Sequence, residues 1–512
     1  MKSIGQLAGN RLPRHLTARI AGWGAAPGAL VWQPAPPVAG DAAIARRLAN
    51  GILLLEGRLI ETREPTPWDI EPPDDVWEAV LHGHGWLDHV VAAQDPKIRK
   101  HFDAWMWTWL DRYGDGTGPG WRPDLVARRL TRWIAHSVDL LLGKPPAVSE
   151  QFFRALGVQA RYLDWRWTET APGVPRIEAL AGLVYARLSL EGTERDTARA
   201  ISHLGWEAEA AVAEDGSVAN RSPEALARIV SLLAWSLQSI RDAGRNPAPQ
   251  HISAIQRAVP VLRALRHPSG ALARFHGGRP GFDLPLEEIV ETAGATLETP
   301  LSSPMGYRRL SQGQSIVIAD CGPPPVRAHA ATAHASPLAF EFSYGSQPII
   351  VNCGTGLGFG PKTALTARQI PAHSMLEIGG SCPSRLSLSG DEVVLTMPTE
   401  VKSRISQDAG GAWLLGESTH YEGKYGLCTE RRLRLTASGT RLEGEDTALA
   451  TSARTRAMAT EAFAEQRIED RAGPMVLRFH LHPSIKASLA LNGRAVSLRI
   501  CLLYTSPSPR DS

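Results

Sequence analysis

The sequence has few cysteines and no long apolar run. Its cysteines, at positions 321, 353, 382, 428 and 501, include no Cys-x-x-Cys pair, so we expect neither a disulfide framework nor a zinc knuckle. The longest stretch without charged residues, 20–40, is broken by four prolines. It cannot form the helix of about 20 apolar residues that crosses a membrane, and it lacks the compact Leu-rich run of a secretory signal. We therefore expect a cytoplasmic chain without a transmembrane segment.

The sequence also has no large excess of positive or negative charge. The chain has 55 Lys+Arg against 52 Asp+Glu, a formal net charge of +3, which gives no electrostatic reason to expect nucleic acid as a partner. A composition of 43% hydrophobic and 21% charged residues excludes a disordered chain, a collagen-like repeat and a coiled coil. At roughly 150 residues per domain, the 512 residues allow two or three domains.

The first part of the chain contains helical periodicity and nearly all the tryptophan. Of 15 tryptophans, only Trp413 follows position 235. Residues 123–142 place apolar side chains close to a 3.6-residue period, and Ser222 before Pro223 is a good helix start. The same periodicity recurs over 150–167, 176–191 and 223–241. Successive antiparallel helix pairs predict an α/α toroid or another helical repeat over 46–300, after an N-terminal extension over 1–45.

After about residue 300 the pattern changes to short alternating strands bounded by Gly and Pro. Such segments are SIVIAD (315–320), LAFEFSYG (338–345), QPIIVNCG (347–354), SMLEIGG (374–380), EVVLTM (392–397), TERRLRLTASGTRLEGED (429–446) and MVLRFHLHP (475–483). Without helices between them they predict an antiparallel β-sandwich over 301–500. The fold class is therefore α+β and multidomain. The last residues, CLLYTSPSPRDS (501–512), look like translated sequencing adaptor, so we expect a non-native tail and a truncated sandwich.

Polar residues gather around three of these strands. His334 precedes one strand, Asn352 ends the next, and His373 opens a third after Arg368. Adjacent antiparallel strands can bring such residues together as metal ligands or polar catalysts. The competing interpretation is that these are structural histidines whose hydrogen bonds are satisfied inside the sandwich.

Four segments resemble one family. AHASPLAFEF, IIVNCG, RQIPAHSML and GPGWRPDLVARRLTRWI (118–134) are similar to motifs of the heparinase II/III-like proteins, polysaccharide lyases with an N-terminal α/α toroid and a C-terminal β-sandwich. The resemblance implies β-elimination on an acidic, uronate-containing glycan, with His334 and His373 as catalytic groups. The substrate-binding residues that it suggests are Trp121, Arg122, Arg128, Arg176 and Arg368.

The chain departs from this family at the groups that perform elimination. The toroid region that should carry the carboxylate-binding Asn reads APGVPRIEAL (171–180) and has none; an arginine there could take over the role by a bidentate contact. Ala225 and Leu226 stand where the family has Tyr and His, and Thr332 replaces the first His of a His-x-His pair.

The metal-binding pattern of the family is altered as well. The ligands of a structural zinc would map to His334, Asn352 and His373, with Asn in place of Asp. A neutral amide is a poor zinc ligand. No cofactor is required by the resemblance, and a structural zinc remains the one metal it suggests.

Two alternatives remain open. The first is a catalytically degenerate lyase fold that binds an envelope or capsular glycan, which the lost residues favour. The second is a glycoside hydrolase that uses two carboxylates from the toroid set Glu169, Glu178, Asp215 and Glu224. The family resemblance also suggests the periplasm or cell envelope as an alternative to the cytoplasm. The sequence specifies neither the glycan nor the oligomeric state.

Overall fold

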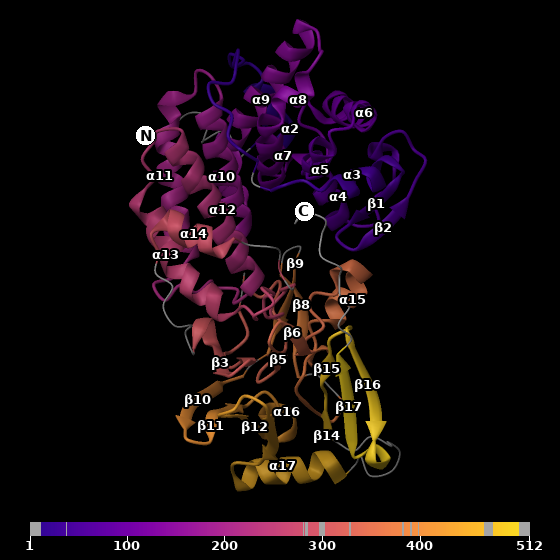
Figure 1. Ribbon diagram of the computed structural model, residues 1–512, viewed down its shortest axis with the longest axis vertical. Coiled ribbons are helices and arrows are strands. Elements are labelled where there is room, and N and C mark those ends of the chain that lie inside the picture. The colour runs from indigo at the N-terminus through magenta and orange to yellow at the C-terminus, as the bar shows by residue number, and fades with distance from the viewer. Residues whose placement is uncertain are drawn as a thin grey trace, which may run out of the picture.

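The computed structural model consists of a helical part followed by a part built of antiparallel sheets (Figure 1). The predicted order of an α/α toroid and then a β-sandwich is thereby confirmed. The structure describes residues 12–500 except 37, 280, 282–284, 296–302, 327–328, 381–382, 390–391, 398 and 465–474. The expected tail at 501–512 lies outside these residues, as does the proposed domain boundary at 300/301. No helix of the described chain is both long enough and apolar enough to cross a membrane.

The predicted helical segments all form helices. The helices of the first part are α2 (Arg14–Ala21), α3 (Ala42–Ala49), α4 (Asp75–His82), α5 (Trp86–Ala93), α6 (Pro96–Tyr113), α7 (Pro123–Ala135), α8 (Ser137–Leu141), α9 (Pro146–Arg166), α10 (Val174–Ser189), α11 (Glu194–Ala211), α12 (Pro223–Asp242), α13 (Pro249–Ala264) and α14 (Leu286–Ala293). The helix expected over 123–142 is divided at His136. Helix α12 starts as predicted, since the hydroxyl of Ser222 accepts a hydrogen bond from the backbone N–H of Ala225.

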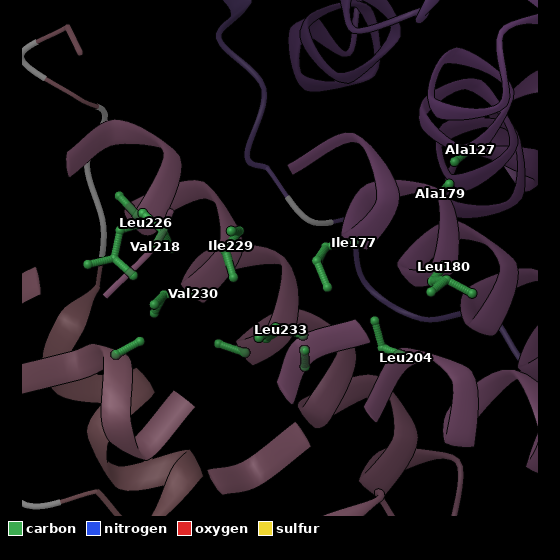
Figure 2. Packing of buried hydrophobic residues seen from close by; sticks show 14 of the residues in the cluster. Ala127, Ile177, Ala179, Leu180, Leu204, Val218, Leu226, Ile229, Val230 and Leu233 are labelled. Carbon is green, nitrogen blue, oxygen red and sulfur yellow. The ribbon is translucent and has the colours of Figure 1, made fainter. Parts of the chain in front are cut away.

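Helix α12 packs its apolar stripe into the toroid core. Leu226, Ile229, Val230 and Leu233 are each no more than 1% exposed, and Figure 2 shows Leu226 beside Val218 with the other three following along the helix. Burying one such side chain contributes about 1.5–3 kcal/mol. The core therefore fixes the rotation of α12 and leaves its opposite face for other contacts.

Helices α7 and α10 approach each other closely at Gly182. A Cβ atom at this position would lie 2.7 Å from the Cβ and 2.9 Å from the Cα of Ala127. We expect Gly182→Ala to lower the free energy of unfolding by about 1–3 kcal/mol through overpacking, measured by urea denaturation. In Gly423→Ala, the control, nothing lies within 4 Å of the new Cβ, so stability should not fall. Equal losses in the two variants would contradict the close approach.

The N-terminal residues contain two features that the periodicity did not predict. A hairpin, β1 (Ile52–Leu55) and β2 (Arg58–Glu61), interrupts the helices. The described part of the N-terminal extension is packed on the toroid, where Arg161 donates hydrogen bonds to the carbonyls of Ala21 and Ala25. This extension is thus a part of the helical domain's surface.

The strands of the second part are all paired antiparallel. They are β3 (Tyr307–Gln312), β4 (Ser315–Asp320), β5 (Phe340–Tyr344), β6 (Gln347–Val351), β7 (Leu376–Ile378), β8 (Arg385–Ser389), β9 (Glu392–Thr396), β10 (Val401–Asp408), β11 (Gly411–Ser418), β12 (Cys428–Thr436), β13 (Leu442–Leu449), β14 (Met475–Leu477), β15 (His480–Leu481), β16 (Ile485–Ala490) and β17 (Ala495–Ile500). The two larger sheets have the orders β15-β6-β5-β4-β3 and β10-β11-β12-β13. A buried cluster that includes Val317, Phe340, Leu414 and Leu435 fills the space between them.

The second part also contains short helices, contrary to the expectation of strands alone. These are α15 (Pro361–Thr366), α16 (Glu422–Tyr425) and α17 (Ala453–Ala464). The first of them follows the glycine-rich segment after β6, and α17 begins after Ser452, whose hydroxyl accepts a hydrogen bond from the Thr455 N–H. Start signals of this kind are local and outweigh the surrounding strand pattern.

Candidate functional site

A cleft of about 520 Å³ lies between the toroid and the sandwich. Its toroid wall includes residues of α7, α10 and α12, and its sandwich wall includes His329, Thr332 and Thr355. A concave site between two domains is where ligands most often bind. This cleft is therefore the candidate functional site.

The charges that line the cleft are balanced and mostly paired. The charged lining residues are Arg122, Arg128, Arg228, Arg279, Glu56, Asp75, Asp124 and Glu224. Arg128 makes a bidentate contact with Glu178 at 2.7 and 2.6 Å, Arg279 binds Glu224 and Glu56, and Arg122 binds Asp124. Such bidentate pairs are strong and leave little residual field. The cleft is thus not a basic groove for a densely charged polyanion.

Small and apolar side chains occupy the positions where the family resemblance places elimination chemistry. Ala225 lines the cleft with a methyl group in place of a phenol, and Leu226 is fully buried in the core. The segment 171–175, Ala-Pro-Gly-Val-Pro, lines the opposite wall without an amide side chain. The aromatic and amide groups that would move a proton and neutralise a uronate are therefore absent from these positions.

His334 and His373 lie side by side in the sandwich, as the strand pattern predicted. The His334 Nδ1 and His373 Nε2 atoms are 3.0 Å apart. The backbone N–H of Gly277 donates to His334 Nε2 at 2.9 Å, and His373 Nδ1 lies 2.8 Å from the carbonyl of Gln369. Since a carbonyl only accepts, His373 carries its proton on Nδ1 and His334 donates from Nδ1 to His373 Nε2. Every ring nitrogen of the pair is thus used.

Both histidines are neutral and closed to a ligand. His334 is 1% and His373 0% exposed. Burial is the main cause that lowers the pKa of His373 to about 4. Burial also holds the pKa of His334 well below its usual value, and the nearby His373 and His276 lower it further. A catalytic base must reach the proton that it removes, which neither ring does here.

Asp320 connects this pair to the toroid. One carboxylate oxygen accepts from Arg221 at 2.5 Å, and the other accepts from Ser336 at 2.7 Å and lies 3.2 Å from His276 Nε2. His276 Nδ1 in turn accepts from the backbone N–H of His334. Burial alone would raise the pKa of Asp320, but Arg221, His276 and the hydrogen bonds hold it well below its usual range. The spacing of the sequence gave no signal for this network, because Arg221 and His276 are far from Asp320 along the chain.

The residues expected to hold zinc do not fit that metal. The Oδ1 atom of Asn352 accepts from the backbone N–H of Ser374 at 3.0 Å. Its other polar atom is therefore the NH₂ group, which has no lone pair for a metal and is buried without a partner. Among the described residues, no group of three His, Cys, Asp or Glu side chains is arranged to hold a metal ion.

The remaining residues that were predicted to bind substrate lie in different surroundings, and only some of them line the cleft. Arg122 and Arg128 line the cleft. Trp121 is 1% exposed and offers no face to a sugar. Arg176 donates to the backbone carbonyls of Thr168 and Thr170 and pairs with Glu207.

Arg368 is a structural clamp rather than a cleft residue. It is 7% exposed, and its guanidinium donates to the carbonyls of Ala330, Ala333 and Val393. A side chain held by three carbonyls within one domain, and buried there, is not turned toward a glycan in the cleft. Its position before His373 in the sequence therefore reflects packing of the sandwich.

The four carboxylates considered for a glycosidase are each held by a donor. Arg166 binds Glu169, Arg128 binds Glu178, the Ser217 N–H binds Asp215, and Arg279 binds Glu224. Donors of this kind stabilise the ionised carboxylate, whereas a glycosidase needs one carboxyl group in its protonated form. The arrangement does not favour that alternative.

Comparison with known proteins agrees with this architecture. Residues 298–506 match the family model for the heparinase II/III-like C-terminal domain. The crystal structure of heparinase III matches with a TM-score of 0.63 at 14% identity, over 87% of this chain and 76% of that one. A heparan sulfate lyase HepC mutant from Pedobacter heparinus matches with a TM-score of 0.52 at 14% identity, over 88% and 73%.

A further relative has a name that does not refer to a lyase. FtsZ-localized protein C of Caulobacter vibrioides is 28% identical over 485 residues, which span 92% of this chain and 81% of that protein. Residues 298–506 are therefore similar to the heparinase II/III-like C-terminal domain, and the chain as a whole has the fold of heparinase III.

Proposed function

We propose that this protein is a catalytically degenerate lyase fold that binds a saccharide in the cleft between toroid and sandwich without cleaving it. The observation that carries the proposal is the closed histidine pair. His334 and His373 are neutral, buried and fully hydrogen-bonded to each other and to backbone atoms. The cleft itself has a volume of about 520 Å³ and polar side chains in its lining, which is what binding without chemistry requires.

Elimination would need a group that takes the proton next to the carboxylate and one that neutralises the carboxylate. The position that resembles the family's tyrosine is Ala225. His329 is the exposed imidazole that lines the cleft, and the described lining residues include no tyrosine. Loss of a general acid–base group typically costs 10²–10⁴-fold in rate, so we expect no measurable turnover.

The test incubates the full chain with a panel of uronate polysaccharides and follows the ultraviolet absorbance of the unsaturated product, with active heparinase III as positive control. Binding is measured in parallel by isothermal titration calorimetry. We expect heat of binding for at least one glycan and no rise in absorbance. A rise that His329→Ala abolishes would show that the cleft is an active lyase site and would overturn the proposal.

A second candidate function is association with FtsZ. The observation that favours it is the relative named for FtsZ localisation, which aligns with 92% of this chain. Both functions are compatible in one protein, since a fold that has lost its chemistry can act as a binding scaffold. Co-sedimentation with FtsZ polymers tests it: enrichment in the polymer pellet supports the association, and an unchanged distribution with and without FtsZ contradicts it. The expected cytoplasmic location stays a prediction.

A further inference from the structure

A second cavity, of about 210 Å³, extends from the cleft into the toroid. The two share Arg128, Val174 and Arg228 in their walls. The two cavities therefore lie next to each other, with these three side chains at their junction. Helices α7, α10 and α12 each contribute one of these shared residues, and α12 continues along the second cavity with Ser231, Leu232 and Trp235.

Helix α12 presents an ordered polar-to-aromatic stripe to this cavity. Arg228, Ser231, Leu232 and Trp235 all line it. Their spacing of i, i+3, i+4 and i+7 places them on one helix face. With a rise of 1.5 Å per residue, the two ends of the stripe are about 10 Å apart along the helix. The stripe thus offers two different anchors, one at each end.

Arg228 is the cationic anchor. The other arginines of the cleft are paired with carboxylates, whereas no described residue forms a hydrogen bond or ion pair with the Arg228 side chain. Its side chain is half-buried at the junction of the two cavities. A planar guanidinium binds a carboxylate by two parallel hydrogen bonds, so the ligand group that fits here is one carboxylate.

Trp235 is the apolar anchor. Its ring stacks on Tyr185 with centroids 4.7 Å apart and planes at 30°, and its indole N–H lies 3.4 Å from the carbonyl of Ala35. Tyr185 is itself held by a hydrogen bond to Pro34 at 3.0 Å. The indole is thus fixed from two sides while it lines the cavity, and a rigid aromatic surface binds apolar ring faces at little entropic cost.

We infer that α12 selects the ligand of the cleft: Arg228 binds a carboxylate on one sugar, and Trp235 packs against the apolar face of a ring in the same saccharide. This inference rests on the proposed binding function and names its substrate class. Among the arginines that line the cleft, Arg228 alone has no described partner. The cleft therefore offers no second unpaired guanidinium to a further anionic group of the ligand. The fitting ligand is a saccharide with isolated carboxylates and no sulfate.

The experiment uses the full chain and two probes in isothermal titration calorimetry. One probe is an unsulfated tetrasaccharide in which uronates alternate with N-acetylhexosamines, and the other is its carboxyl-reduced counterpart. We expect the unaltered protein to bind the first about tenfold more tightly, the size of one hydrogen-bonded charge contact. Arg228→Gln should remove this preference and leave binding of the reduced probe unchanged. Trp235→Leu should weaken both probes by a similar factor.

Arg245→Gln is the matched control, because Arg245 is an exposed arginine after α12, outside both cavities; it should keep the full preference. Thermal unfolding of each variant checks that it is folded. If Arg228→Gln keeps the preference, or if the unaltered protein binds both probes equally, the inference is wrong while the binding function stands. If the unaltered protein binds neither probe, the inference and its proposed function both fail.

Discussion

Arg221→Met is expected to lower the free energy of unfolding by about 3–5 kcal/mol, the cost of leaving a buried charge without its partner. Arg221 belongs to the toroid but binds three sandwich groups: the Asp320 carboxylate and the carbonyls of Met305 and Pro323. The Asp320 side chain is 2% exposed and the Arg221 side chain 12%. Chemical denaturation measures the loss, and two separated transitions in place of one would show that the halves no longer unfold together.

The matched control is Arg99→Met. Arg99 pairs with Asp139 at 2.7 Å, and both side chains are 33% exposed. Water screens such a pair, so the substitution should cost less than about 1 kcal/mol. Equal effects of the two substitutions would contradict the view that Arg221 joins the two halves of the molecule.

Acid is expected to unfold the protein between pH 6 and about pH 4. Burial is the main cause that lowers the pKa of His82 to about 3, of His251 to about 4, of His373 to about 4 and of His420 to about 3. In the unfolded chain these rings take up a proton near pH 6.5. Below that pH the unfolded state binds more protons than the folded state, so stability falls as the pH falls.

The size of the acid effect follows from the same values. A folded pKa near 4 against 6.5 when unfolded corresponds to roughly 3 kcal/mol for His373 alone once the pH is below both. A few such groups together equal the free energy of unfolding of a typical domain, which is roughly 5–15 kcal/mol. Denaturation midpoints at successive pH values measure this. His420→Asn should reduce the slope of the free energy of unfolding against pH by the equivalent of about one proton. His329→Gln, at an exposed position, should leave this slope unchanged. A profile that is flat from pH 7 to pH 4 would contradict the buried neutral histidines.

Local pattern was sufficient to predict the order of helices and strands. The 3.6-residue period located α9, α10 and α12, and the Ser222–Pro223 pair marked the start of α12 to the residue. The alternating segments located the main strands, including β4 over the predicted residues 315–320. Hairpin β1–β2 and the helices within the sandwich were missed, because each is specified by a few local residues, whereas the prediction followed the periodicity of longer segments.

The site could be predicted only in part, since its contacts join distant segments. Strand spacing brought His334 and His373 together correctly, but their hydrogen-bond partners Gly277 and Gln369 decide whether they are reactive, and spacing does not reveal such partners. Arg221 reaches Asp320 across 99 positions of sequence. The burial of Trp121 could not be predicted from the sequence either, because it depends on the residues that pack around it and not on the residue type.

The pairing of charges is equally invisible in the sequence. Arg128 and Arg228 have similar sequence surroundings on two helices of the toroid, yet Glu178 neutralises the first and no described group neutralises the second. A free arginine can hold a ligand carboxylate, while a bidentate pair is already satisfied. The selectivity proposed for the cleft therefore depends on the packing of α7, α10 and α12.

The His334–His373 pair is a neutral structural element that is closed to substrate and metal. Nuclear magnetic resonance of the protein carrying isotope-labelled histidine reads the proton position on each ring directly. We expect both rings to be neutral at pH 6 with the proton on Nδ1, and we expect their signals not to move when zinc or a uronate oligosaccharide is added. Protonated rings at that pH, or signals that shift with zinc or glycan, would contradict this expectation.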